Sequence, residues 1–253
     1  MNESIIQSIL SGTRQAVTYV HPIVGLKDGV TQAKEILTRF ATGDGQMRTV
    51  GDLLVDVTLS PESRVQLDLL CLGTIFDALA LHQVTDHLLF VNLDPMTLEH
   101  PEFWDRMEPW LWNLSIPPHR IVMEITEAYA SQDRGTLESN ARRLRNLGLR
   151  IAVDDLGSGI ASLAHMARLT PDFIKVDKSL VRDVHRHPYQ AALLNALAVF
   201  AERMRVGYIA EGIETTEELQ AVIDADVPWG QGFIFGEPEP LRFPVPEAQP
   251  LNG

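Results

Sequence analysis

The sequence predicts one α/β domain of the (β/α)8, or TIM-like, barrel class. Short apolar segments rich in β-branched residues alternate with longer segments of helical periodicity, which is typical of β–α units around a parallel sheet. The chain has 253 residues, a length that suits a single barrel of this kind. An open doubly wound sheet is the competing architecture. Such a sheet usually carries a glycine-rich phosphate loop after its first strand, and none follows Val17–Val24.

The elements follow from local patterns along the chain. The predicted strands are, in order, Val17–Val24, Leu88–Leu93, Ile121–Ile125, Arg150–Asp154, Phe173–Val176, Val206–Ala210 and Gly232–Phe235. Helical spacing covers Val50–Leu81, Arg134–Leu147 and Tyr189–Arg205, and Thr215–Glu218 has the form of a capping box that begins another helix. Prolines become frequent after Glu237. We therefore expect an N-terminal extension over residues 1–14, the folded domain over 15–240 and an irregular tail over 241–253.

Composition restricts the classes of function. The formal net charge of −13 argues against a DNA- or RNA-binding protein, although a metal ion could still bring a small anionic substrate to an acidic site. The one cysteine, Cys71, lies in an apolar run, so we expect a buried thiol and no internal disulfide. The first residues do not resemble a signal peptide, and the apolar runs are too short to span a bilayer. We expect a cytoplasmic protein without a membrane segment.

Acidic side chains recur at the ends of the predicted strands. Asp154 and Asp155 end one apolar run and precede a glycine-rich turn, and Glu124, Asp177 and Glu211 close others. In a barrel the carboxyl ends of the strands meet at one face, so these groups predict an oxygen-rich site for a divalent metal. Each group also has an ordinary structural explanation. Asp155 could begin a turn, the glutamates could cap helices, and Lys175 could pair with Asp177.

Two earlier positions are ambiguous when they are taken alone. Glu35 and Arg39 are four residues apart, so on a helix they would form a routine surface ion pair. Asn92 ends an apolar run, where it could be a turn residue or a neutral oxygen ligand.

The polar positions form an ordered series of short motifs. The series comprises His21-Pro22-Ile23, Glu35-Ile36-Leu37-Thr38-Arg39, Asn92, Glu124-Ile125-Thr126-Glu127, Asp154-Asp155-Leu156-Gly157-Ser158-Gly159, Lys175 with Asp177, Ala210–Glu214 and Gln231-Gly232. In this order, from about Tyr19 to Pro238, the chain resembles the EAL-domain phosphodiesterases that hydrolyse cyclic di-GMP to linear pGpG. Each motif alone is weak, and their joint order is specific.

The resemblance implies a role for each matched residue. It implies one Mg²⁺ or Mn²⁺ on Glu35, Asn92, Glu124 and Asp154, and a second ion on Asp154, Asp155 and Glu211. It implies that Lys175 orients a water or offsets charge, that Glu211 also helps to remove a proton, and that Arg39, His21 and Asp177 contact the substrate. Glu127 is expected to brace the glycine-rich loop, and Glu214 and Gln231 to support the metal ligands. A homodimer is the expected assembly.

Three departures from the family pattern leave other functions open. His21 stands where the family has a glutamine that contacts guanine, and Leu156 and Ile160 replace aromatic residues of the loop after the aspartates. One alternative is therefore an inactive EAL-like module that binds cyclic di-GMP or a protein partner. Another is an unrelated barrel enzyme that uses Mg²⁺ on a different anionic substrate.

Overall fold

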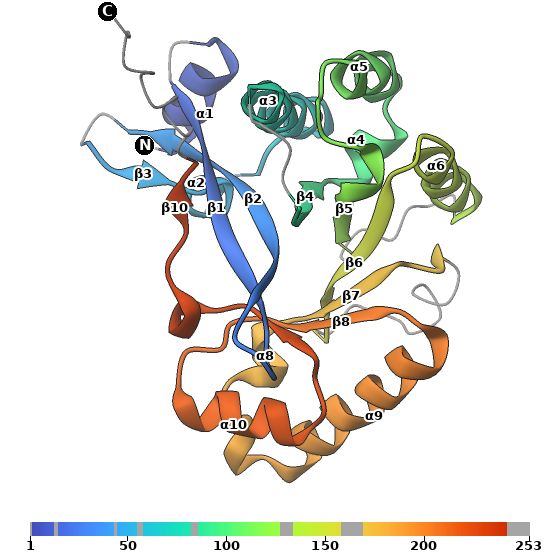
Figure 1. Ribbon diagram of the computed structural model, residues 1–253. Helices are drawn as coiled ribbons and strands as arrows, with labels where there is room; N and C mark the ends of the chain where they lie inside the picture. The colour runs from blue at the N-terminus through green and yellow to red at the C-terminus, as the bar shows by residue number, and fades with distance from the viewer. Residues whose placement is uncertain are drawn as a thin grey trace, which may run out of the picture.

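Eight strands close into a ring in the computed structural model, which describes residues 2–12, 15–42, 45–54, 58–81, 86–126, 134–157 and 169–241. Going round the ring, the strands are β1 (Ala16–Gly25), β2 (Thr31–Ala41), β4 (Leu88–Leu93), β5 (Ile121–Thr126), β6 (Arg150–Leu156), β7 (Phe173–Val176), β8 (Gly207–Ala210) and β9 (Trp229–Gly230). The pairing of β1 with both β2 and β9 closes the barrel (Figure 1). The predicted barrel class is confirmed.

The barrel closes at β1, and the strand directions there differ from the expected all-parallel arrangement. The first strand, β1, runs antiparallel to β2 and to β9, and the remaining neighbours in the ring are parallel. The strand β2 lies where no strand was predicted, and β1 and β2 form a long hairpin that crosses the front of the ring (Figure 1). Two short strands add to the sheet at this point: β3 (Met47–Arg48) pairs with β2, and β10 (Glu239–Pro240) pairs with β1.

The last predicted strand was misplaced. The segment Phe233–Phe235 forms the 3-10 helix η3, and the strand β9 comes earlier, at Trp229–Gly230. Between them the chain passes so close to the backbone of Ile213 that a side chain at Gly232 would overlap it.

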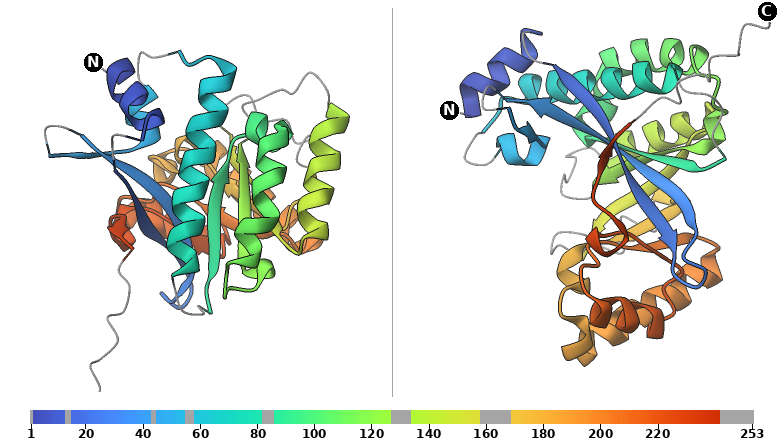
Figure 2. Two further views of the ribbon diagram at one scale, coloured as in Figure 1. Left: turned by 90° about the horizontal axis from the view of Figure 1, so that it is seen from above. Right: turned by 60° about the vertical axis from the view of Figure 1, so that its left-hand side comes forward.

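Helices cover the ring in two groups that lie on opposite sides of the barrel (Figures 1 and 2). The first group is α2 (Val50–Leu54), α3 (Pro61–Ala80), α4 (Pro95–Glu99), α5 (Pro101–Trp112) and α6 (Arg134–Asn146), with the 3-10 turn η1 (Pro118–Arg120) before β5. The second group is α8 (Lys178–Val181), η2 (Val184–Arg186), α9 (Pro188–Met204) and α10 (Thr216–Asp224). The predicted capping box begins α10, since Thr215 and Glu218 each accept a hydrogen bond from the other's backbone.

Separate apolar clusters hold the two groups to the sheet. The helices α3, α5 and α6 pack on β4, β5 and β6, and α9 and α10 pack on β7 and β8. A third cluster joins the N-terminal helix α1 (Asn2–Leu10) to this body, because Ile6 and Ile9 pack with Phe40, Leu53 and the buried Cys71. Within the described ranges, no helix combines the length and apolar content needed to cross a bilayer.

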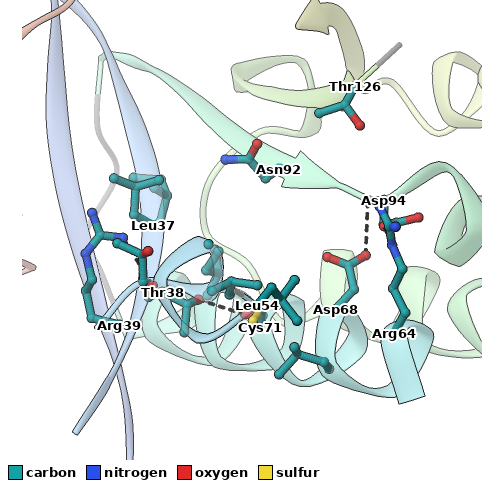
Figure 3. A pocket seen from close by; sticks show the side chains of 16 residues that line it. Leu37, Thr38, Arg39, Leu54, Arg64, Asp68, Cys71, Asn92, Asp94 and Thr126 are labelled. Atoms are coloured by element: carbon teal, nitrogen blue, oxygen red, sulfur yellow. Dashed lines mark hydrogen bonds and ion pairs between the residues drawn. The ribbon is translucent and has the colours of Figure 1, made fainter. Parts of the chain in front are cut away.

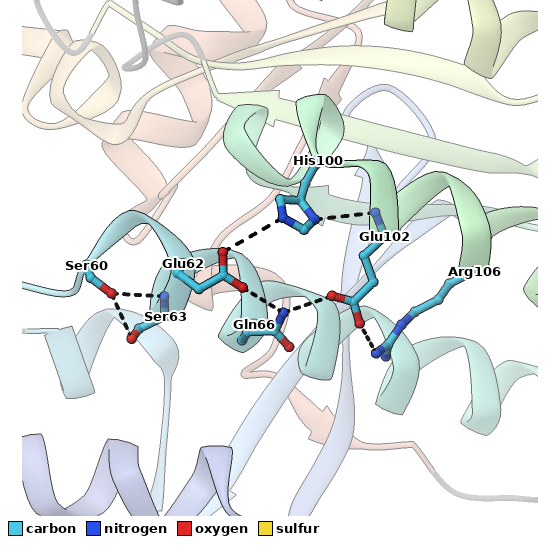
Figure 4. Close-up of polar contacts among 7 residues, drawn as sticks. All are labelled: Ser60, Glu62, Ser63, Gln66, His100, Glu102 and Arg106. Atoms are coloured by element: carbon cyan, nitrogen blue, oxygen red, sulfur yellow. Dashed lines mark hydrogen bonds and ion pairs between the residues drawn. The ribbon is translucent and has the colours of Figure 1, made fainter.

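Polar side chains link α3 to α5 on the outer surface of the first group (Figure 4). Gln66 donates a hydrogen bond to Glu102 at 2.9 Å, and Glu102 pairs with Arg106 one helical turn later. The His100 ring accepts a hydrogen bond from the Glu102 backbone at 3.3 Å and thereby caps α5. These contacts connect the two helices at the surface and lie outside the barrel interior.

Candidate functional site

The barrel interior has two layers of side chains. The inner layer is apolar and consists of Ile23, Ala33, Phe90, Val122, Ala152, Phe173 and Ile209, with Trp229 packed against it. Residues two positions apart on a strand point to the same side, so the next inward position of each strand forms a second layer. That layer is entirely polar: His21, Glu35, Asn92, Glu124, Asp154, Lys175, Glu211 and Gln231.

Lys175 lies at the centre of the polar layer. Its ammonium nitrogen, Nζ, is 2.6 Å from Glu124 Oε1, contacts Glu211 Oε1 and lies 3.8 Å from Asp154 Oδ1. Glu35 Oε1, from β2, lies 4.0 Å from the same nitrogen. The side chains of Lys175 and Glu124 are 1% and 0% exposed, so one buried ammonium offsets several carboxylates. The excess of negative charge is suited to binding divalent cations.

Neutral amides hold Glu35. Asn92 Nδ2 donates to Glu35 Oε1 at 3.0 Å, and Gln231 Nε2 donates to Glu35 Oε2 at 2.6 Å. The Gln231 amide also lies 2.6 Å from His21 Nδ1, and His21 Nε2 lies 3.1 Å from the Gly236 carbonyl oxygen. The carboxylate therefore keeps a fixed orientation and retains lone pairs for a further ligand.

The end of β6 brings two adjacent carboxylates to the same place. The pairing with β7 is irregular between Val153 and Leu156, and Asp155 adopts a left-handed conformation with φ 60°. The Asp155 backbone N–H donates to Asp154 Oδ1 at 2.8 Å, which closes the turn. One oxygen each from Asp154, Asp155 and Glu211 lie within 4.8 Å of one another, a spacing that a metal ion could bridge.

The environment moves the pKa values of these groups in different directions. Burial raises the pKa of Glu124 well above its ordinary value, since the attraction of Lys175 is outweighed by burial and by the other carboxylates. Burial likewise raises the pKa of Glu211 to about 8 and that of Asp155 to about 6. The pKa of Glu35 is lowered, because Lys175 and the two amides outweigh its burial. Burial acts against the charge on Lys175, but the carboxylates around it raise its pKa well above the usual value.

Arg39 lies apart from the polar layer. Glu35 and Arg39 share the inward side of β2, so the helical surface pair considered from the sequence does not form. Arg39 is half-buried, 5.8 Å from the centre of the Tyr19 ring, and lines a cavity of about 350 Å³ that Asn92 also borders (Figure 3). Asp68 and Asp94 line the same cavity, and the Asp94 backbone N–H donates to Asp68 Oδ2 at 3.1 Å.

The remaining predicted residues lie at the edges of the site or outside the described residues. Asp177 caps α8 by accepting a hydrogen bond from the Ser179 backbone at 2.9 Å. Glu214 borders a second cavity of about 260 Å³, which Glu35, Asp154 and Glu211 also line. Glu127 and Ile160 lie outside the described residues.

Sequence reasoning missed several residues of these two cavities. Lys178 and Phe233 line the smaller cavity, and Asp68 the larger one. Lys178 directly follows the Lys-x-Asp motif, which was a usable signal. Asp68 lies inside the helix α3, where an acidic residue gives no indication that it faces a cavity.

Comparison with known proteins decides the family. The model of the EAL domain family matches residues 4–238. The chain belongs to the EAL domain family. Among curated members, an uncharacterised signalling protein of Caulobacter vibrioides is 35% identical over 151 residues, which is 60% of this chain and 19% of that protein. The cyclic di-GMP phosphodiesterase PdeA of Borreliella burgdorferi is 27% identical over 155 residues, 61% of this chain and 23% of its own length. The matched region thus spans about a fifth of these relatives.

Solved EAL structures share the fold. BlrP1 of Klebsiella pneumoniae, in a complex with calcium and cyclic di-GMP, superimposes with a TM-score of 0.78 and is 26% identical. The match covers 88% of this chain and 56% of BlrP1. The barrel and its helices therefore belong to an architecture that carries a dinucleotide and a metal in that relative.

Proposed function

We propose that this EAL domain hydrolyses cyclic di-GMP to linear pGpG with the help of two divalent metal ions, Mg²⁺ or Mn²⁺. The observation that carries the proposal is the polar layer at the barrel mouth. Its carboxylates come from separate strands and outnumber the one buried ammonium, Lys175. A purely structural ion-pair cluster would be expected to balance its charges.

The donor set fits metal ions. Glu124 Oε2 is buried and has no hydrogen-bond partner among the described residues, which is costly unless another cation approaches it. The proposed ligands of one ion are Glu35, Asn92, Glu124 and Asp154, and those of the second ion are Asp154, Asp155 and Glu211. Carboxylate and amide oxygens are the ligands that Mg²⁺ and Mn²⁺ prefer. Two bound ions would lower the pKa of a water and offset negative charge on the attacked phosphate.

The protein's own groups would move and hold the proton. Burial raises the pKa of Glu211 in the metal-free site to about 8, which is close to neutrality, and the ionised form of this carboxylate would accept a proton from the attacking water. Lys175 stays charged among the carboxylates and would offset charge that develops on the phosphate. Gln231 and Glu214 border the same cavity and would hold the ligands or their waters in place.

The substrate would lie across the two cavities. Arg39 offers a planar guanidinium beside the larger cavity, which suits a phosphate oxygen. Asp177, whose charge raises the pKa of Asp155, would meet the substrate from the side of β7. We further propose a homodimer in the cytoplasm. The location is inferred from the single buried cysteine.

The experiment is a direct assay of the purified protein. Cyclic di-GMP is incubated with Mg²⁺ or Mn²⁺, with an EDTA control, and pGpG is followed by chromatography. The variants Asp155→Ala and Glu211→Ala should lose turnover while nucleotide binding partly survives, and the exposed Asp224→Ala serves as the matched control. No pGpG alongside measurable binding would instead support an inactive receptor, the alternative suggested by His21 and Leu156. Turnover untouched in both variants would contradict the metal assignment.

A further inference from the structure

His21 occupies an unusual place for a residue expected to contact a substrate base. It lies on β1 inside the barrel mouth, and only 8% of its surface is exposed. Both ring nitrogens already have partners in the protein: Gln231 at Nδ1 and the Gly236 carbonyl at Nε2. Neither nitrogen is left for a guanine.

The partners determine which nitrogen carries the proton. A carboxylate such as Glu35 can only accept, so the Gln231 atom that faces it must be the amide NH2. The same NH2 lies 2.6 Å from His21 Nδ1, which must therefore accept its second hydrogen. The Gly236 carbonyl can also only accept, so His21 Nε2 must carry the ring proton. Because the Glu35 carboxylate and the Gly236 carbonyl are both acceptors, His21 must be the neutral tautomer with its proton on Nε2.

The resulting hydrogen-bond chain runs from Gly236 through His21 and Gln231 to Glu35. In this chain, His21 and Gln231 are 210 positions apart in the sequence, and Gln231 and Glu35 are 196 positions apart. The hydrogen bonds therefore link β1 and β2 to the segment after β9. Gln231 donates both amide hydrogens within this chain. Its Oε1 is buried without a hydrogen-bond partner in the described part of the structure. Without His21, the amide could rotate and present that oxygen to the Glu35 carboxylate, which would repel it.

We propose that His21 is a positioning residue that holds the Gln231 amide in the one orientation that supports Glu35 as a metal ligand. Asn92 holds the other oxygen of Glu35, so the two amides together fix the carboxylate. This inference rests on the proposed function for its effect on metal binding. The tautomer and the hydrogen-bond chain do not depend on it.

The effect on metal binding is tested with His21→Leu, His21→Gln and an exposed control, His185→Leu. Mn²⁺ affinity is measured by calorimetry, and KM for cyclic di-GMP at saturating Mn²⁺. Loss of a group that orients a metal ligand costs about 10–100-fold in affinity, which is the expected result for His21→Leu, with KM changed by less than about threefold. A glutamine side chain offers both an acceptor and a donor, so His21→Gln should restore affinity to within about threefold.

The opposite pattern would overturn the inference. Unchanged Mn²⁺ affinity in His21→Leu with KM raised about tenfold would identify a base contact, as the family resemblance implies. A folded His21→Gln variant that fails to restore the affinity would also count against positioning. Circular dichroism of each variant separates either result from a failure to fold.

An independent readout is the ¹⁵N spectrum of histidine-labelled wild-type protein without metal. The chemical shifts should show His21 as the Nε2–H tautomer at pH 7, with the exposed His185 as the reference. An Nδ1–H or doubly protonated ring would contradict the hydrogen-bond chain. If the wild-type protein neither binds Mn²⁺ nor forms pGpG, the proposed function fails, and this spectrum still tests the hydrogen-bond chain through His21.

Discussion

The two halves of the barrel mouth hold their carboxylates by different means. On the β5–β8 side, Glu124, Asp154 and Glu211 converge on the buried ammonium of Lys175. On the side formed by β2, β4 and β9, Glu35 is held by the uncharged amides of Asn92 and Gln231. We call the first the lysine side and the second the amide side. On the lysine side the ammonium attracts the carboxylates strongly, but several negative groups lie close together. On the amide side the hydrogen bonds orient the Glu35 carboxylate without adding charge.

The pKa values show what this difference does to the same chemical group. Burial raises the pKa of Glu211 to about 8 on the lysine side, whereas the pKa of Glu35 falls below its usual value on the amide side. Both glutamates are buried and both lie near Lys175. The difference is that Glu35 also receives two amide hydrogen bonds, whereas Asp154 and Glu35 oppose ionisation of Glu211. Hydrogen-bond donors that favour the charged form help to keep Glu35 ionised at a pH where Glu211 still binds a proton.

Removing the ammonium should have the largest effect. The variant Lys175→Met leaves buried carboxylates without a cation, and we expect unfolding to become easier by about 3–5 kcal/mol in EDTA at pH 8. Urea denaturation of the variant measures this loss. The exposed Lys27→Met is the control and should change stability by less than about 0.5 kcal/mol. A loss below about 1 kcal/mol for Lys175→Met would show that the lysine does not hold this side together.

The next largest loss of stability is expected from a backbone change on the lysine side. Gly212 directly follows Glu211, has φ +66°, and a Cβ there would overlap the Cβ of Lys178. We expect Gly212→Ala to cost about 2–3 kcal/mol in thermal or urea unfolding. Gly29 has φ +69° with open space around it, so Gly29→Ala isolates the conformational cost at about 1 kcal/mol. Equal losses in the two variants would mean that contact with Lys178 does not fix the Glu211 segment.

The amide side should respond more in metal affinity than in stability. Replacing Asn92 by Ala removes one neutral hydrogen bond, so we expect unfolding to become easier by only about 1–2 kcal/mol. Because the carboxylate loses its orientation and a proposed ligand is removed, Mn²⁺ affinity should fall at least about tenfold by calorimetry. The exposed Asn146→Ala is the control. A stability loss as large as that of Lys175→Met, or an unchanged Mn²⁺ affinity, would remove the distinction between the two sides.

A pH dependence is expected at the cavity that Asp68, Arg39 and Asn92 line. Burial raises the pKa of Asp68 from its ordinary 3.8 to about 7, so the folded state binds this proton more tightly than the unfolded state. The stabilisation by the bound proton is complete below about pH 4 and is lost as the pH rises to about 7. Asp68→Asn cannot titrate and can still accept from the Asp94 backbone. A shift of about three pKa units, at about 1.4 kcal/mol per unit, sets an upper bound of about 4 kcal/mol on the unfolding free energy that the variant should gain over wild type between pH 4 and pH 8. A constant difference across this range would mean that Asp68 titrates normally.

The site residues that could be predicted from the sequence are those whose pattern lies within a single strand. Phe90-Val91-Asn92, Val122-Met123-Glu124, Ala152-Val153-Asp154 and Phe173-Ile174-Lys175 each place a polar residue two positions after an inward apolar one. These short buried runs carried both the barrel prediction and the acidic site. The same spacing in Ala33-Lys34-Glu35 could have revealed β2, but the four-residue interval to Arg39 also fits a helix.

The parts that the sequence could not show depend on distant partners. The strand β2 exists because β1 pairs with it over nine positions, and β9 is a two-residue strand with no periodicity of its own. The chain from His21 to Gln231 spans 210 positions, so no local pattern indicates that the two side chains meet. Family resemblance supplied the candidate residues there, and the structure supplied their contacts.

The two proposed metal sites can be tested directly by anomalous diffraction from crystals of the protein grown with Mn²⁺. We expect two peaks in the polar layer, one bounded by Glu35, Asn92, Glu124 and Asp154, and the other by Asp154, Asp155 and Glu211. The first would join the amide side to the lysine side through a shared ion. Mn²⁺ found only outside this layer, or absent from it at saturating concentration, would contradict the claim that the two halves form one metal centre.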